Sequence, residues 1–295
     1  MTIDFDGVHP AVVTPFDRDG AFDAASFERL LDRLYAEGVH GIYVGGTTGE
    51  GSSQTVRQRK EVLESAIRST PPGKQVIAHV GASSLEDALE LARHAASAGA
   101  TAISSLPPLG LYSFPEVRDF YAALAGAAEV PLFLYYFPEL SSTAGSLDQL
   151  LELCGLANVA GLKFTSFDLY KLCELRREGH MVLNGRDEVF AAGMLMGANG
   201  GIGTFYNLMP REFVRIYQLA GESRWDEARA TQQEVNRVIR ATIQHSIFPA
   251  VKLILSWMDL DCGSCLPPRR PLTPREAGEL RASLKDTCLE PALVR

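Results

Sequence analysis

The chain has 295 residues, of which 46% are hydrophobic and 22% charged, and its formal net charge is −8. This composition is typical of a soluble globular protein. The negative charge, with no basic block, argues against nucleic acid and anionic membranes as main partners, and no apolar run is long enough to span a bilayer.

Hydrophobic periodicity predicts eight strand–helix units in strict alternation. The expected strands are 8–13, 39–44, 75–80, 101–105, 130–136, 160–166, 181–184 and 200–203. The expected helices lie near 24–37, 56–67, 85–98, 114–127, 147–154, 169–177, 187–196 and 210–219. Such alternation predicts a parallel sheet, and eight strands are the number that closes a (β/α)8 TIM barrel.

The remainder of the chain has no strand signal. Added helices are expected near 226–245, 247–257 and 274–283, and no linker sets them apart. We therefore expect an α/β protein with a catalytic barrel over 1–222 and a C-terminal helical extension, 223–295, packed on it. An open doubly wound sheet is the alternative, but no Gly-x-Gly-x-x-Gly follows the first strand.

Lys163 stands in the middle of the apolar strand expected over 160–166. Burial disfavours the charged form of a lysine, and a neutral amine attacks a ketone to form a Schiff base. Side chains alternate along a strand, so Gly161, Lys163 and Thr165 share one face. The alternative is a lysine that extends from a strand end to water.

Three other strand ends carry residues suited to chemistry, which in a barrel lies at the C-terminal ends of the strands. Residues 46–49, Gly-Thr-Thr-Gly, form either an anion-binding turn that fits a carboxylate or a plain loop. Tyr135, on the opposite face from Tyr136, either moves protons beside an amine or simply packs in the barrel. Asp187 and Glu188 either favour a helix start by their charge or bind a ligand.

Four motifs together resemble the N-acetylneuraminate lyase / dihydrodipicolinate synthase superfamily of pyruvate-dependent class I aldolases. They are Gly-Thr-Thr-Gly-Glu at 46–50, Tyr-x-x-Pro at 135–138, Gly-Leu-Lys-x-Thr at 161–165, and the run from 184–188 (Asn-Gly-Arg-Asp-Glu) to 200–207. The last run resembles the N-acetylneuraminate lyase branch in particular. The similarity covers about 8–207 and, more loosely, the helical tail.

The resemblance implies a role for each matching residue. Lys163 would form the Schiff base with the keto carbon, and Tyr135 would relay protons. Thr47 and Thr48 would hold the pyruvate carboxylate. The pocket for the polyhydroxylated part would be lined by Thr165, Gly185, Asp187, Glu188 and Thr204. The implied reaction is cleavage of N-acetylneuraminate to N-acetylmannosamine and pyruvate in a homotetramer, with neither a metal nor an organic cofactor.

Three features bear on which branch the chain follows. Arg186 stands where many lyases of this group have an aromatic residue, and it adds a cation at the pocket mouth. Leu140 stands where dihydrodipicolinate synthases carry an arginine that holds a second carboxylate. The loop at 107–112 carries an aromatic residue into a neighbouring subunit's site in relatives, and Tyr112 does not align clearly with that position.

The alternatives are an aldolase or dehydratase for another 2-keto-3-deoxy sugar acid, a dihydrodipicolinate synthase, and a non-catalytic pyruvate-binding sensor. A sensor needs no nucleophile, so Lys163 and Tyr135 argue against it. The chain starts with acidic residues and no apolar signal core, and its five cysteines are scattered. Both features predict reduced thiols and a cytoplasmic protein. Cys262 and Cys265 have the spacing of half a zinc site, but no second pair lies nearby, so no metal is expected.

Overall fold

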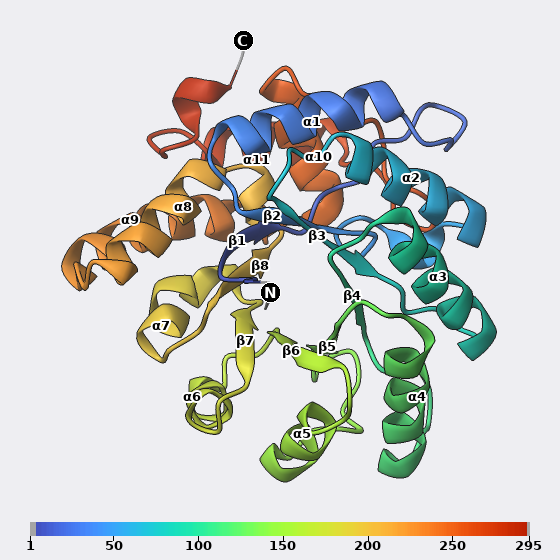
Figure 1. Ribbon diagram of the computed structural model, residues 1–295. Coiled ribbons are helices and arrows are strands. Elements are labelled where there is room, and N and C mark those ends of the chain that lie inside the picture. Colours follow the sequence, from blue (N-terminus) through green and yellow to red (C-terminus); the bar gives the residue numbers. More distant parts are fainter. Residues whose placement is uncertain (1–3, 294–295) are drawn as a thin grey trace.

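The computed structural model describes residues 4–293, and its eight parallel strands form a barrel inside a ring of helices (Figure 1). The strands are β1 (Gly7–Pro10), β2 (Gly41–Val44), β3 (Gln75–His79), β4 (Ala102–Ser105), β5 (Leu132–Tyr136), β6 (Val159–Phe164), β7 (Met181–Asn184) and β8 (Gly200–Gly203). Their order is β1-β8-β7-β6-β5-β4-β3-β2. A parallel bridge between Ala11 and Tyr43 joins β1 to β2 and closes the circle, so the predicted barrel is confirmed.

One helix follows each strand. These helices are α1 (Ala24–Ala36), α2 (Val56–Arg68), α3 (Leu85–Ala98), α4 (Phe114–Ala127), α5 (Leu147–Cys154), α6 (Leu169–Arg177), α7 (Phe190–Leu195) and α8 (Pro210–Gly221). Side-chain caps define several of their starts, because the first backbone N–H groups of a helix lack partners within the helix. Asp23, Thr55 and Ser84 each accept a hydrogen bond from the backbone N–H three residues further on.

Side chains fill the barrel on both faces of the sheet. Phe133 and Tyr135 of β5 belong to a buried cluster inside the barrel, together with Tyr43. Tyr136 belongs to the larger cluster between strands and helices, where its ring lies 5.0 Å from that of Phe164. The expected opposite orientation of Tyr135 and Tyr136 is therefore confirmed.

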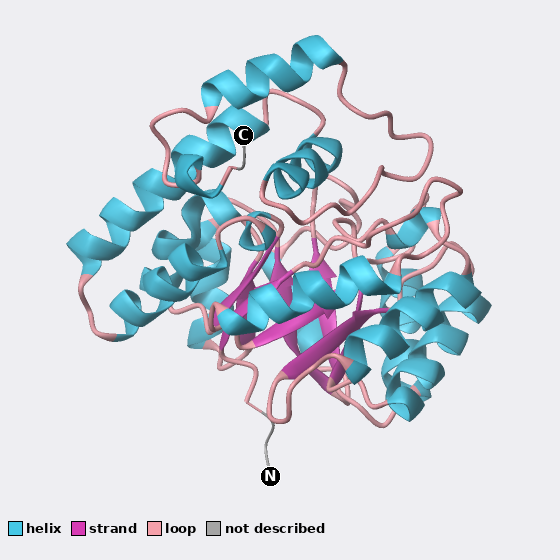
Figure 2. Ribbon diagram, turned by 90° about the horizontal axis from the view of Figure 1, so that it is seen from above, coloured by secondary structure: helices cyan, strands magenta, loops and turns pink. Residues whose placement is uncertain are grey.

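The C-terminal extension consists of α9 (Trp225–Thr242), α10 (Ile247–Trp257) and α11 (Pro274–Ser283). Helix α9 packs against α7 and α8, beside which it lies in Figure 1, and α10 contacts α9 and α11. Figure 2 shows the strands in the middle of the molecule with helices around them. None of the described helices alone is long and apolar enough to cross a membrane, whereas α9 and α10 taken together pass that test but are bent by 112°.

Several boundaries differ from the expected ones. Strand β1 ends at Pro10, because Val12 and Val13 bond instead to the Tyr43 carbonyl and the Asn207 side chain. The lysine strand ends at Phe164. The helix expected over 187–196 begins with a 3-10 turn, Asp187–Val189, and α7 follows it.

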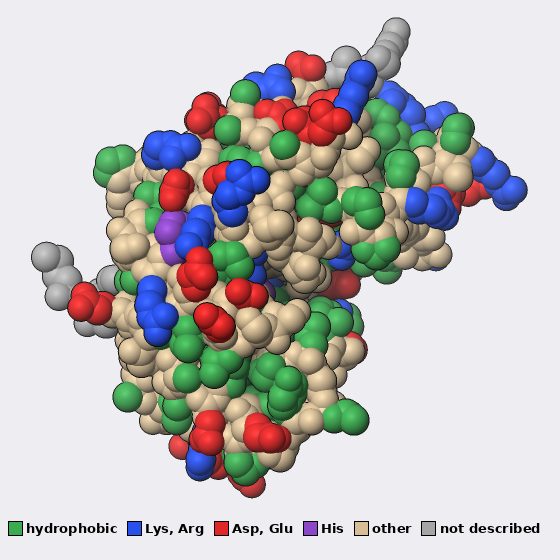
Figure 3. Space-filling view, turned by 90° about the vertical axis from the view of Figure 1, so that its right-hand side faces the viewer, with side chains coloured by type: hydrophobic (Ala, Val, Ile, Leu, Met, Phe, Trp, Pro, Cys, Tyr) green, Lys and Arg blue, Asp and Glu red, His purple; other side chains and the backbone are tan. Residues whose placement is uncertain are grey.

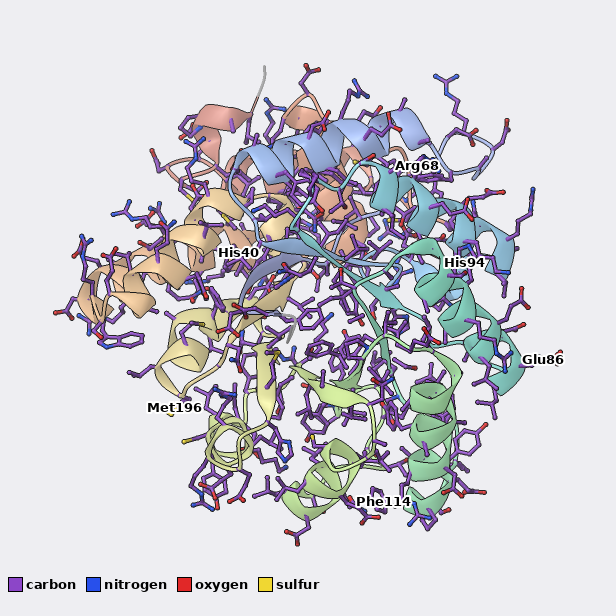
Figure 4. All side chains as sticks on the ribbon, viewed as in Figure 1. His40, Arg68, Glu86, His94, Phe114 and Met196 are labelled. Atoms are coloured by element: carbon purple, nitrogen blue, oxygen red, sulfur yellow. The ribbon has the colours of Figure 1, made fainter. Side chains whose placement is uncertain are left out.

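On the face shown in Figure 3, acidic and basic side chains are interspersed over the left part, and several basic side chains gather at the upper right. Figure 4 places Glu86 of α3 and Met196, just after α7, at the periphery of the helical ring. Many surface charges pair locally, such as Lys60 with Glu90 at 2.6 Å. Such pairs contribute little to stability.

Candidate active site

A cavity of about 140 Å³ lies at the C-terminal ends of the strands. It is lined by all nine residues predicted from the sequence: Thr47, Thr48, Tyr135, Lys163, Thr165, Gly185, Asp187, Glu188 and Thr204. They come from strands β2, β5, β6, β7 and β8 or from the loops directly after them. A larger hollow of about 700 Å³, between the loop after β1 and the C-terminal helices, includes none of these nine residues.

Lys163 is only 4% exposed, and aromatic rings flank its amine nitrogen. Its Nζ lies 4.0 Å from the ring centroid of Tyr135 and 4.3 Å from that of Tyr43. Tyr135 is the direct partner of Lys163 in the β5–β6 register, which explains why the two side chains meet inside the barrel. Ring faces attract a cation but form no covalent or strong hydrogen bond with it, so the nitrogen stays available for a reaction in the cavity.

Tyr43 lies beside Lys163, although no motif in the sequence indicated it. Its hydroxyl donates to Ser104 Oγ at 3.1 Å, and its ring stands edge-on to Tyr135 with 6.2 Å between centroids. Burial raises the pKa of Tyr43 well above its ordinary value, so the hydroxyl stays protonated. Strands of a parallel barrel are buried on both faces, and the apolar run 41–44 therefore does not reveal which side chains point inward.

The loop after β2 presents Thr47 and Thr48 to the cavity. The hydroxyls of Thr48 and Thr204 lie 2.7 Å apart and share a hydrogen bond. The carbonyl of Gly49 accepts from both Thr14 Oγ1 and Gln54 Nε2, at 2.8 and 2.6 Å. These contacts hold the loop in one conformation, so its hydroxyls are fixed in the cavity.

Asp187 and Glu188 occupy another side of the cavity. Asp187 is buried, and its Oδ2 accepts a hydrogen bond from the backbone N–H of Phe205 at 2.7 Å. The Asp187 side chain thus ties the loop after β7 to the loop after β8. Gly185 leaves room here, since a Cβ at this position would clash with Thr165 Oγ1.

Asp187 predicts a pH dependence of stability. Burial is the main cause that raises the pKa of its carboxyl to about 8, against about 3.9 in an unfolded chain. Between these values the folded protein keeps a proton that the unfolded chain releases, so the free energy of unfolding falls as pH rises. We expect Asp187→Asn to flatten this dependence in urea unfolding between pH 5 and 8. An unchanged slope would contradict the assignment.

Arg186 lines the cavity, where the sequence predicts an added cation, and its charge is paired. Its guanidinium forms an ion pair with Glu139, from the loop after β5. It also lies over the rings of Phe167 and Phe137, at 4.5 and 5.2 Å from their centroids. The pair links two loops at the cavity and neutralises the charge of Arg186. Leu140, next to Glu139, is exposed and does not line the cavity.

The C-terminal extension also reaches the site, which the sequence did not indicate. Ile243, Ile247 and Phe248 line the cavity, and the last two belong to the first turn of α10. These residues belong to no recognisable motif. Only the packing of α9 and α10 against the barrel brings them there.

Comparison with known proteins identifies the family. A model of the dihydrodipicolinate synthetase family matches residues 4–287. The chain belongs to this family. The N-acetylneuraminate lyase of Rhizobium meliloti (strain 1021) is 38% identical to it, over 94% of this chain and 92% of the relative. The N-acetylneuraminate lyase of Shigella boydii serotype 4 (strain Sb227) is 37% identical, over 96% of this chain and 97% of the relative. The wild-type sialic acid aldolase of Ruminococcus gnavus has a TM-score of 0.90 with 28% identity, over 95% of each chain. The resemblance stated from the four motifs is therefore confirmed, and the lysine, tyrosine and threonines described above lie in a member of the dihydrodipicolinate synthetase family.

Proposed function

We propose that this family member is a Schiff-base aldolase that cleaves N-acetylneuraminate to N-acetylmannosamine and pyruvate. One observation carries the proposal: the buried Lys163 nitrogen lies against the rings of two tyrosines, in a cavity that also holds the Thr47 and Thr48 hydroxyls. This combination supplies a nucleophile for a ketone and donors for the carboxylate next to it. The names of the relatives support the choice of substrate.

The reaction follows from these groups. The Lys163 amine attacks the keto carbon and water leaves, which gives a protonated imine. The imine withdraws electrons from the bond between the third and fourth carbons, and that bond breaks while the hydroxyl on the fourth carbon loses its proton to become an aldehyde. The resulting enamine gains a proton on the third carbon, and water then releases pyruvate and restores the amine. Tyr135 is the group that we assign to these proton transfers.

The other side of the cavity suits a polyhydroxylated chain. Glu188 offers carboxylate oxygens, and Thr165 and Thr204 offer hydroxyls that both donate and accept. Leu140 stands where dihydrodipicolinate synthases carry an arginine, and the Arg186 guanidinium that does line the cavity is paired with Glu139. Paired donors for a second carboxylate are therefore not offered, and aspartate semialdehyde is a poor fit. A second candidate substrate is another 2-keto-3-deoxy sugar acid. The cavity carries the ion pair of Arg186 with Glu139 at a position where many lyases of this group have an aromatic residue.

The choice between these substrates can be measured in the condensation direction. With pyruvate, kcat/KM is expected to be higher for N-acetylmannosamine than for aspartate semialdehyde, because the cavity offers hydroxyl partners and lacks a second carboxylate site. A higher value for the semialdehyde would overturn the branch assignment and leave the Schiff-base mechanism in place. If another sugar aldehyde alone reacts, Arg186→Phe is the first variant to test.

We also propose that the protein acts as a cytoplasmic homotetramer. The loop after β4 exposes three apolar side chains, Leu109, Leu111 and Tyr112, and such exposed groups suit a contact with another subunit. Light scattering after size-exclusion chromatography measures the mass in solution. We retain 1–222 and 223–295 as the proposed division into barrel and extension.

A further inference from the structure

Two sides of the cavity are each attached to different residues of the C-terminal extension. We propose that the extension positions them separately: Lys252 holds the loop at 46–50, which we call the carboxylate loop, and Gln232 with Asn236 holds residues 185–188, which we call the polyol turn. This inference rests on the proposed function, because it assigns pyruvate to the first side and the sugar aldehyde to the second.

The first attachment is a buried ion pair. Glu50 ends the carboxylate loop and is fully buried, and its Oε1 lies 2.9 Å from Lys252 Nζ on α10. The backbone N–H of Leu266 donates to the other oxygen of Glu50 at 2.8 Å. Lys252 is 3% exposed, donates to the Ser264 carbonyl at 3.1 Å and lies over the Phe16 ring. The Glu50 carboxylate thus has partners from the C-terminal extension on both oxygens, with the Arg269 guanidinium as a further cation at 3.9 Å.

The geometry of Glu50 connects this pair to the threonines. Glu50 has a φ of 57°, in the left-handed region that a non-glycine residue adopts only when its surroundings enforce it. Its backbone N–H bonds to the Thr47 carbonyl at 3.3 Å. Loss of the Lys252 contact removes a force that holds this conformation. The first effect is then on the orientation of Thr47 and Thr48.

The second attachment uses side-chain amides. Gln232 of α9 is buried; its Nε2 donates to the Asp187 carbonyl, and its Oε1 accepts from the Ala191 N–H, both at 2.9 Å. Asn236, one turn later, donates to the Glu188 carbonyl at 2.9 Å. The two amides are joined to each other by a further hydrogen bond of 2.9 Å. They fix the backbone of the polyol turn without lining the cavity themselves.

These two attachments predict separable kinetic effects, measured by varying pyruvate and N-acetylmannosamine independently in condensation. Lys252→Met is expected to raise KM for pyruvate about tenfold or more and to change KM for the aldehyde little, because displacement of a binding group by a fraction of an ångström weakens binding. Gln232→Met and Asn236→Leu are expected to raise KM for the aldehyde and to change KM for pyruvate little. Each variant thus serves as the control for the other side. The surface pair variant Lys60→Met/Glu90→Gln should change neither KM.

A double variant separates positioning from stability. Lys252→Met alone leaves the buried Glu50 with the more distant Arg269 guanidinium, at 3.9 Å, in place of Lys252, and lowers the melting temperature. Glu50→Gln/Lys252→Met removes both charges of the close pair and should recover much of that loss. We expect KM for pyruvate to stay raised in the double variant. Recovery of KM together with stability would overturn the positioning role of the pair.

Equal effects of the Lys252 and Gln232 variants on both KM values would overturn the separate roles.

A trapping measurement distinguishes this inference from the proposed function. Borohydride with pyruvate alone reports occupancy of Lys163 without any aldehyde, and the pyruvate concentration for half-maximal trapping should rise in the Lys252 variants but not in the Gln232 variants. If wild-type protein traps no pyruvate, the proposed function fails and this inference fails with it. If wild-type protein traps pyruvate normally but the Lys252 variants leave the half-maximal concentration unchanged, only the inference fails.

Discussion

Lys163→Ala is expected to abolish pyruvate release while leaving the fold intact. The alanine removes the nitrogen that forms the imine in the proposed mechanism, and it leaves the neighbouring rings of Tyr43 and Tyr135 unchanged. Borohydride reduction in the presence of pyruvate should leave a stable adduct on the peptide that contains Lys163 in the wild type, and no adduct in the variant. Circular dichroism and the melting temperature check the fold.

Lys171 provides the matched control for this experiment. It lies on α6, directly after the lysine strand, but its ammonium forms an ion pair with Asp168 at 3.2 Å and it does not line the cavity. Lys171→Ala should keep both the adduct and the activity. An adduct found only on lysines other than Lys163 would rule out the proposed nucleophile.

Tyr135→Phe is expected to lower kcat by about a hundredfold or more, the range typical of a lost general acid–base group. Phenylalanine keeps the ring that lies beside Lys163 Nζ and stacks on Phe137, with 6.1 Å between centroids. The variant therefore removes the hydroxyl with little change in packing. Steady-state cleavage kinetics measure the effect, and borohydride trapping shows whether the imine still forms.

Tyr136→Phe is the matched control, because the same substitution is made one residue along the strand. Tyr136 lies on the outer face of β5, against Phe164, and does not line the cavity. Its loss of a hydroxyl should change kcat much less than the loss at Tyr135. Equal effects of the two substitutions would show that the proton relay is not on the inner face of β5.

The sequence by itself determined the barrel and nine of the residues that line its cavity. Eight strand–helix units are a local property, since each depends on periodicity and on caps such as Asp23 within a few residues. Alternation along a strand places Tyr135 and Tyr136 on opposite faces, and the Tyr-x-x-Pro motif selects Tyr135 as the inner one. Parallel strands also end at the same edge of the barrel, so residues at successive strand ends had to converge.

Only the tertiary structure decided which side chains complete the site and how they are held. The orientation of Tyr43, the ion pair of Arg186 with Glu139, and the attachment of Glu50 to Lys252 depend on segments that are distant along the chain. A charged residue in the sequence shows its sign but not its partner, and the partner decides whether it acts as a free cation or as part of a neutral pair. Local periodicity carries no information about such pairs, because they form when helices such as α10 pack against the barrel.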